Sequence, residues 1–116
     1  MDDILLIDKK MSRADLKKVA LKRFGDLVKG VVDIKKGIMA IGGELHADEE
    51  AFLLTRDSKQ QNLWGINLYP DLTMPDMLEF DSMINIRPSQ GNTSRNVEDP
   101  GLQEKITVIV TQLITD

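Results

Sequence analysis

The sequence predicts an α+β domain in which an antiparallel sheet of about four to six strands packs with an N-terminal and a C-terminal amphipathic helix. Apolar residues recur at helical spacing near both ends of the chain. Short runs rich in β-branched residues, bounded by turn residues, lie between them. The length of 116 residues suits a single domain, residues 1–116, with one core of modest size.

The N-terminal part of the chain predicts a strand followed by a helix. An apolar run at residues 4–7 indicates a first strand packed in the core. Ser12 has the character of an N-cap, with Asp15 three residues later as an imperfect capping box. Apolar residues then follow at helical spacing up to Phe24, and Gly25 stands where a C-terminal glycine cap belongs. The first helix is therefore expected between Ser12 and Gly25.

A β-hairpin is expected next. Residues 27–34 and residues 38–41 contain the β-branched and other apolar side chains of two strands, and residues 35–37, Lys-Lys-Gly, separate them as a short turn. Gly42 and Gly43 would then end the second strand or form a bulge in it.

Residues 44–57 are ambiguous between helix and strand. The acidic residues at 48–50, followed by an apolar run, suit a short capped helix. The alternation of Leu45, Ala47, Ala51 and Leu53 instead suits a strand. For the second half of this segment we favour a strand.

Two further strands are expected in the second half of the chain. Residues 63–69 are rich in apolar and aromatic side chains, and Pro70 ends that run. Residues 72–78 form a connector. Residues 78–86 then alternate between apolar and polar side chains, which predicts a half-buried strand.

The C-terminal helix has a clear start signal. Asp99 stands at the cap position and Pro100 at the first helical position, where proline is favoured. An apolar stripe at helical spacing follows, formed by Leu102, Ile106, Ile109, Val110 and Leu113.

The composition excludes several classes of site. The chain has no cysteine, which rules out disulfides, thiolate metal ligands and cysteine nucleophiles. No apolar run approaches the roughly 20 residues of a membrane-spanning helix, and acidic residues at the N-terminus do not suit a signal peptide. A cytoplasmic protein without a membrane partner is therefore expected.

The net charge of −4 is unevenly distributed. Residues 1–36 hold ten of the 15 Lys and Arg residues and six of the 19 acidic residues, whereas residues 37–116 hold the other five basic and 13 acidic residues. The pI of about 5.0 does not suit a general nucleic-acid binder, because neutralising phosphates supplies most of that affinity. A nucleic-acid partner is not expected.

The polar loop at residues 87–95 is the main candidate for a ligand site. It carries two arginines, a glycine and several neutral donors, and no acidic residue. Arginine presents a planar fork of donors that suits phosphate or carboxylate, and glycine lets backbone amides approach an anion closely. The expected ligand-binding residues are Asn85, Arg87, Ser89, Gln90, Asn92, Ser94 and Arg95.

The same loop could instead be a structural cap that bonds to itself. In that case Arg87 would pair with Asp81, with Glu79 or with an acidic residue of the last helix. Trp64, Asn67 and Tyr69 could line a groove beside the loop, although Trp64 is expected to anchor the core. The loop lacks the Gly-x-x-x-x-Gly-Lys pattern of a phosphate-binding P-loop.

His46 is the one histidine and a weaker candidate for catalysis. On a strand, Glu44, His46 and Asp48 would point to the same face and could form a facial metal triad or a His–carboxylate acid/base pair. A lone histidine between acidic residues is more often a local hydrogen-bond partner at a strand end. No metal and no cofactor is assigned from these residues.

Three stretches together resemble a family of small prokaryotic proteins classed as a domain of unknown function. They are GGELHAD at residues 42–48, LWGINLYP at residues 63–70 and EFDSMINIRP at residues 79–88. The resemblance extends from about Phe24 onward. It implies a stand-alone bacterial or archaeal domain and leaves the type of activity open.

Three functions remain open on the sequence alone. The first is a binding module that holds a small anionic ligand or an acidic partner through residues 87–95. The second is an enzyme or metal site that uses Glu44, His46 and Asp48. The third is a self-associating interaction module, a homo-oligomer in which a sheet edge pairs with a copy of itself.

Overall fold

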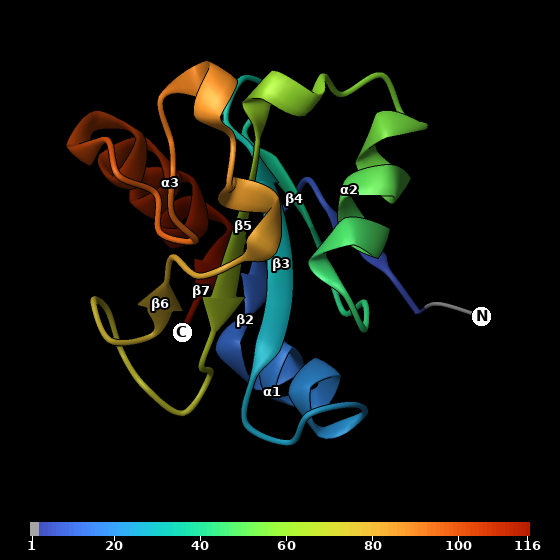
Figure 1. Ribbon diagram of the computed structural model, residues 1–116. Helices are drawn as coiled ribbons and strands as arrows, with labels where there is room; N and C mark the ends of the chain where they lie inside the picture. The colour runs from blue at the N-terminus through green and yellow to red at the C-terminus, as the bar shows by residue number, and fades with distance from the viewer. Residues whose placement is uncertain (1–2) are drawn as a thin grey trace.

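The structure is a computed structural model that describes residues 3–116. A sheet lies in the middle of the molecule, with helices on both of its faces (Figure 1). The helices are α1 (Arg13–Leu21), α2 (His46–Leu54) and α3 (Pro100–Leu113). The strands are β1 (Leu5–Ile7), β2 (Met11–Ser12), β3 (Val28–Asp33), β4 (Ile38–Ile41), β5 (Leu63–Leu68), β6 (Leu78–Glu79) and β7 (Ile114–Thr115). Short 3₁₀ turns occur at Gln60–Asn62, Met83–Asn85 and Pro88–Gln90.

The main sheet is antiparallel and has five strands in the order β1-β4-β3-β5-β6. Its centre is the β3–β5 pair, in which Val28 lies opposite Leu68 and Asp33 opposite Leu63. The predicted β3–β4 hairpin is present, with Asp33 opposite Ile38. A separate parallel pair joins β2 to β7 and so connects the two ends of the chain.

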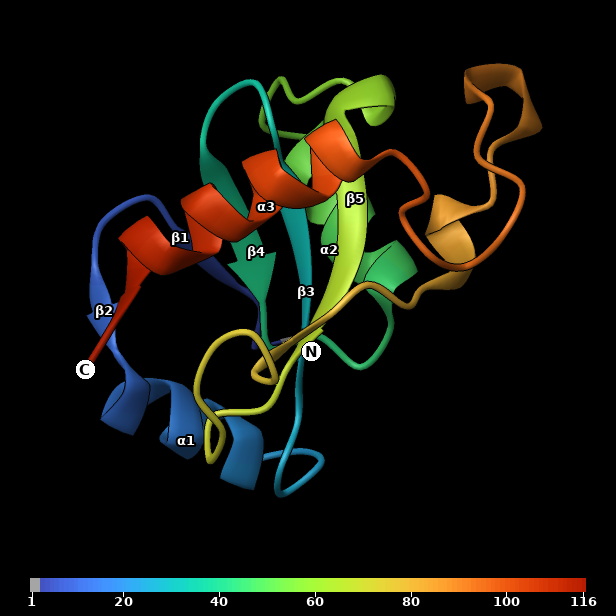
Figure 2. The ribbon, with the colours of Figure 1, turned by 90° about the vertical axis from the view of Figure 1, so that its left-hand side faces the viewer.

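Each face of the sheet covers its own apolar cluster. The larger cluster lies under α1 and α3 and includes Trp64. Trp64 is 2% exposed, so its expected place in the core is confirmed. The smaller cluster contains Val31, Ala40, Leu53 and Leu63 and lies under α2. Figure 2 shows α3 crossing one face of the sheet with α2 on the far side. The α+β prediction with its flanking N-terminal and C-terminal helices is confirmed.

The N-terminal capping signals for α1 and α3 are confirmed. The Ser12 hydroxyl accepts a hydrogen bond from the Asp15 amide, whereas the expected glycine cap is wrong, because α1 ends at Leu21 with Lys22 as its C-cap and Gly25, with a positive φ of 91°, lies in the turn that follows. The Asp99 side chain caps α3 by accepting from the Gly101 amide, with Pro100 at the first position. No helix in residues 3–116 is long and apolar enough to cross a membrane.

Two predicted strands are wrong in part. The second half of residues 44–57 is helical, since α2 extends from His46 to Leu54. The expected strand at residues 78–86 pairs only at Leu78 and Glu79 and continues into a 3₁₀ turn. β1 is also less buried than expected, because Leu5 is 43% and Leu6 38% exposed.

An asparagine side chain takes the place of the missing strand beside β5. The Asn85 Oδ1 accepts a hydrogen bond of 2.8 Å from the Gly65 amide, and its Nδ2 donates to the Gly65 carbonyl at 3.0 Å. A neighbouring strand would make the same pair of bonds to the backbone. Because the Asn85 side chain makes these bonds in place of a strand, the sheet ends early at this edge. Residues 82–85 then turn across the face of the sheet that α2 also covers.

Candidate functional site

The loop at residues 87–95 makes most of its polar contacts with the protein itself. Asn85 is fully buried, and Asn92 is 4% exposed. The Asn92 Nδ2 donates to three carbonyls, including that of Asn85 at 2.7 Å. The Gln90 side chain donates to the Gln61 carbonyl at 3.1 Å. These expected ligand-binding residues therefore hold the loop against the body of the domain, whereas Ser89 is exposed.

Arg87 is buried, at 8% exposed, and its guanidinium bonds to several segments of the chain. It donates from Nε to the Ile84 carbonyl, from one terminal nitrogen to the Gln60 carbonyl at 2.8 Å, and from the other to the Leu63 carbonyl. Its acidic partner is Glu50 of α2, at 3.3 Å. The expected pairing with Asp81, Glu79 or the last helix is wrong, because α2 brings Glu50 to this place.

The Arg87 guanidinium also lies over the Trp64 ring, 4.8 Å from its centroid. Burial lowers the pKa of Arg87, and the charge of Glu50 opposes that shift. The fifth N–H of the guanidinium donates to Gln90 Oε1 at 3.4 Å, so Arg87 has no donor left for an external ligand. Its role here is to connect α2, the start of β5 and the polar loop.

Glu98 follows the loop in the sequence, and its carboxylate accepts hydrogen bonds from several donors of the loop. Its Oε2 accepts from the Ser94 hydroxyl at 2.6 Å, from the Thr93 amide at 3.1 Å and from the Thr93 hydroxyl at 3.4 Å. The Ser94 hydroxyl is the largest cause of a lowered pKa at Glu98. The amide of Glu98 donates to Asn92 Oδ1 at 2.9 Å. An anion does lie against the loop, and it is a side chain of the chain itself.

Arg95 is the loop arginine that reaches a cavity. Its side chain is 54% exposed and its Nε lies 2.6 Å from the Asp81 carboxylate, which is 43% exposed. Both residues line a hollow of about 260 Å³, here called the α2 pocket. The pocket is lined by Leu27, Lys29, Leu45, His46, Ala47, Asn67, Asp81, Ser82, Met83, Ile84 and Arg95.

The base of the α2 pocket is a cross-strand pair. Lys29 of β3 lies opposite Asn67 of β5, so both side chains are on the same face of the sheet. The Asn67 Nδ2 donates to Glu79 at 2.9 Å and to the Asp81 carbonyl at 3.1 Å. Because both partners are acceptors, the amide orientation is fixed. Asn67 is only 7% exposed, and its buried Oδ1 has no hydrogen-bond partner among the described residues.

His46 lies at the start of α2, on the pocket. Its Nε2 is 2.8 Å from the Ile66 carbonyl, which can only accept, so Nε2 carries the proton. Burial lowers the pKa of His46, and the bond to Ile66 together with the nearby Asn67 amide opposes that shift. The ring is therefore neutral at pH 7, and its Nδ1 is an acceptor.

The electrostatics of the α2 pocket favour a negative group. Lys29 and Arg95 contribute two positive charges and Asp81 one negative charge. The first turn of α2 also faces the pocket through His46 and Ala47, and no side chain caps this helix end in the described structure. Uncapped N-terminal amides carry a partial positive charge and donate readily to anions.

Glu44, His46 and Asp48 do not gather as a metal-binding group. Their expected common face required a strand, and His46 and Asp48 instead lie on the first turn of α2. In residues 3–116 no cluster of three or more His, Asp or Glu side chains is arranged to hold a metal ion. Of the three, His46 lines the pocket.

The other aromatic candidates lie apart from the pocket wall. Trp64 is buried on the opposite, α1–α3 face of the sheet. Tyr69 donates from its hydroxyl to Glu79 at 3.0 Å, and its pKa is raised by burial and by that carboxylate. Lys29 is the charged pocket residue that the sequence did not suggest, because its place in the pocket depends on which residue of β5 lies opposite it.

The comparisons with known proteins found a family match. A family model described as "Protein of unknown function (DUF5674)" matches residues 5–113. No curated protein and no solved structure matches the chain.

Proposed function

The chain belongs to the DUF5674 family, and we propose that it is a binding module whose α2 pocket holds a small organic anion. The observation that carries this proposal is the convergence of Lys29, His46, Asn67 and Arg95 on one hollow of about 260 Å³. His46, Asn67 and Arg95 come from separate parts of the sequence, and each was a candidate in its own right.

The anionic group of the ligand would lie between the start of α2 and Lys29. His46 and Ala47 line the pocket at a helix start that no side chain caps in the described structure, and Lys29 adds a full positive charge from the base of the pocket. A carboxylate accepts well from both kinds of donor. Arg95 supports this charge from the rim, although its pairing with Asp81 reduces its share.

A second group of the ligand would be a hydrogen-bond donor. Asn67 Oδ1 is a buried acceptor without a partner among the described residues, and the neutral His46 ring offers Nδ1 as another acceptor. A buried polar atom without a partner costs free energy, which a hydroxyl or amino group would recover. A small hydroxy acid or amino acid supplies both a carboxylate and such a donor.

The rim of the pocket suits an apolar portion of the ligand. Leu45 is 53% and Met83 is 65% exposed, and both line the opening. Methionine and leucine at a rim can pack against an aliphatic chain. A hollow of about 260 Å³ is small, which favours a small organic anion over the acidic surface of a protein partner.

The test is thermal stabilisation and calorimetric titration with hydroxy acids, amino acids, simple carboxylates and phosphate. A ligand that binds the folded state raises the melting temperature in a saturable way. We expect Asn67→Asp and Lys29→Gln to abolish the response. The matched control is Lys105→Gln, since Lys105 is exposed on α3, away from the pocket. If none of these anions gives a saturable shift, or if the shift survives both pocket variants, the proposal is wrong.

A further inference from the structure

β1 forms one end of the five-stranded sheet and pairs only with β4 in the described chain. Its other edge carries no strand. Leu5 and Leu6 are 43% and 38% exposed, although both are apolar. Proteins usually protect such edges with charges, proline, a bulge or a very short strand; β1 is short, but its apolar side chains and free backbone groups can still pair with another strand.

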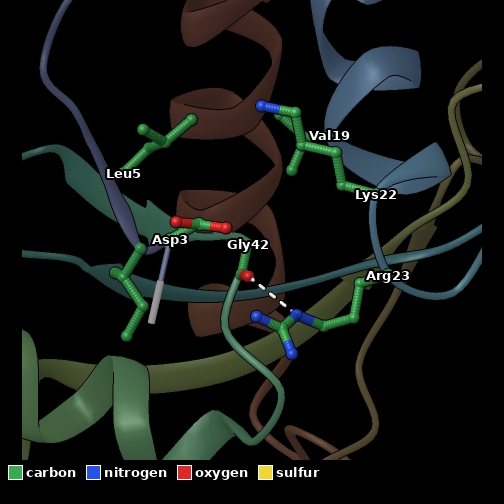
Figure 3. Close-up of a pocket in the computed structure, with 7 residues that line it drawn as sticks. Asp3, Leu5, Val19, Lys22, Arg23 and Gly42 are labelled. Atoms are coloured by element: carbon green, nitrogen blue, oxygen red, sulfur yellow. Dashed lines mark hydrogen bonds between the residues drawn. The ribbon is translucent and has the colours of Figure 1, made fainter. Parts of the chain in front are cut away.

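The side chain of Leu5 is exposed because α1 leaves a hollow beside it. Figure 3 shows Asp3 and Leu5 on one wall of this hollow, with Val19 of α1 and the following Lys22 and Arg23 on the other. Its volume is about 420 Å³. The Leu5 side of β1 therefore has room for side chains from another strand.

The hydrogen-bond pattern of the sheet shows which backbone groups of β4 face β1. The Gly42 amide donates to the Lys29 carbonyl at 3.3 Å, which places Gly42 in a hydrogen-bonded position towards β3. Such positions recur at every second residue of an antiparallel strand. Met39 and Ile41 therefore direct their backbone groups away from β3, towards β1.

The same alternation continues on β1. Leu5 lies opposite Ile41, and Ile7 lies opposite Met39, so both make the ladder bonds to β4. The amide and carbonyl of Leu6, between them, then point to the open edge. Leu6 is the position from which a further antiparallel strand would begin to pair.

We propose that two copies of this chain form a symmetric dimer by antiparallel pairing of their β1 strands, centred on Leu6. In this register Leu6 lies opposite the partner's Leu6, and Leu5 lies opposite the partner's Ile7. The two five-stranded sheets would then join into one continuous sheet across the two-fold axis.

Charge complementarity selects the second copy as the occupant and selects this register. Continued beyond the three residues of β1, pairing centred on Leu6 places Asp3 towards the partner's Lys9, which lies at a bend two residues after the strand, and the symmetry makes the contact twice. Neither Asp3 nor Lys9 takes part in an ion pair within residues 3–116. Centring the pair on Leu5 would instead place Asp3 against the partner's Ile7 and lose the contact with Lys9, whereas the Leu6-centred register keeps that contact and leaves Asp8 opposite the partner's Ile4.

The dimer is expected to be weak. A strand of three residues buries much less than the roughly 800 Å² per partner of a standard interface, so dissociation in the micromolar to millimolar range is expected. This interaction is independent of the α2 pocket, which lies over β3 and β5 and is separated from β1 by β4, so either proposal can fail alone.

The test is sedimentation of the purified chain over roughly a hundred-fold range of concentration, together with three variants. Leu6→Pro removes the outward amide without touching a ladder bond to β4, and we expect dimerisation to weaken at least about ten-fold. Lys9→Asp should weaken it through the repulsion from Asp3, and the double variant Asp3→Lys with Lys9→Asp should restore it.

The charge variants keep the test informative even if Leu6→Pro unfolds the protein. A chain that stays monomeric across the whole range overturns the proposal. A dimer that the β1 variants leave unchanged does the same, because it must use another surface. Recovery in the double charge variant is the result that identifies β1 pairing, since general damage to the strand cannot produce it.

Discussion

The Glu98 carboxylate accepts a hydrogen bond of 2.6 Å from the Ser94 hydroxyl. Donors of the polar loop that suggested a site for an external anion therefore already bind an internal carboxylate, that of Glu98. The loop, residues 87–95, acts as a cap over the end of the sheet, and Arg95 at its far end reaches the α2 pocket.

We expect Glu98→Gln to lower the melting temperature at pH 7 and to remove part of the loss of stability in acid. The pKa of Glu98 is lowered in the folded state, chiefly by the Ser94 hydroxyl. A carboxylate with a lowered folded pKa stabilises the fold above its unfolded pKa and loses that contribution as pH falls through the folded value. The window therefore lies below the ordinary value of 4.5.

Acid unfolding of the native chain and of Glu98→Gln measures this difference. The matched control is Glu104→Gln, since Glu104 is exposed on α3 and takes no part in the described ion pairs. Curves for Glu98→Gln and the native chain that stay parallel below pH 4.5 would show that the loop does not stabilise the charged carboxylate.

Arg87→Ala and Arg95→Ala are expected to differ sharply in stability. Arg87 is 8% exposed, and its loss leaves Glu50 and three carbonyls without their donor, a cost of about 3–5 kcal/mol. Arg95 pairs with Asp81 at the surface, so its loss is expected to cost less than about 1 kcal/mol. Urea denaturation of both variants provides the comparison. Equal costs would contradict the assignment of Arg87 as the structural arginine.

The free energy of unfolding should also fall with rising pH because of Glu49. Glu49 is fully buried, and burial raises its pKa to about 9 from 4.5. The folded state then keeps a proton that the unfolded state releases across this window, so stability decreases as pH rises. At 1.36 kcal/mol per pH unit, the contribution between pH 5 and pH 8 is about 4 kcal/mol.

Glu49→Gln mimics the protonated acid and should flatten that slope. The Gln side chain can still accept from the Gly43 amide, as Glu49 Oε2 does at 2.9 Å. Denaturation at several values between pH 5 and pH 8, with Glu104→Gln as the exposed control, isolates the effect. Equal slopes in the native chain and Glu49→Gln would mean that Glu49 is charged in the folded state.

The sequence predicted the elements whose signals are local. The side chains of Ser12 and Asp99 cap the first turns of α1 and α3, and both residue types are typical of helix starts. Gly37, with a positive φ of 69°, lies in the turn of the β3–β4 hairpin. α2 was ambiguous in the sequence because its buried face consists of Glu49 and Leu53, four residues apart. A glutamate on the inner face removes the apolar stripe that reveals a helix.

The candidate site depends on contacts that no local pattern specifies. Lys29 and Asn67 meet because of the β3–β5 register, and a shift of one residue would send both side chains to the other face. The strand predicted at residues 78–86 ends early because the Asn85 amide bonds to Gly65. His46 and Arg95 were each recognisable as polar candidates, but their convergence required the tertiary structure.

Gly65 provides the sharpest test of the packing beneath the pocket. A Cβ added at Gly65 would lie 2.4 Å from Ser82 Cβ and 2.6 Å from its hydroxyl, distances that the folded chain cannot accommodate without moving residues 82–85. Ser82 caps that 3₁₀ turn and lines the α2 pocket. We therefore expect Gly65→Ala to destabilise the protein by about 1–3 kcal/mol and to weaken anion binding.

The matched control is Gly30→Ala on the neighbouring strand. A Cβ at Gly30 would meet Ile41 and Ile66 side-chain carbons at 3.4 Å, an ordinary contact, and an alanine in a strand restricts the unfolded chain more than glycine does. Its stability should change by less than about 1 kcal/mol, in either direction. Equal losses in the two variants would show that glycine in these strands matters for the backbone alone. A loss confined to Gly65→Ala assigns the cost to the close approach of Ser82, the contact that positions the pocket wall.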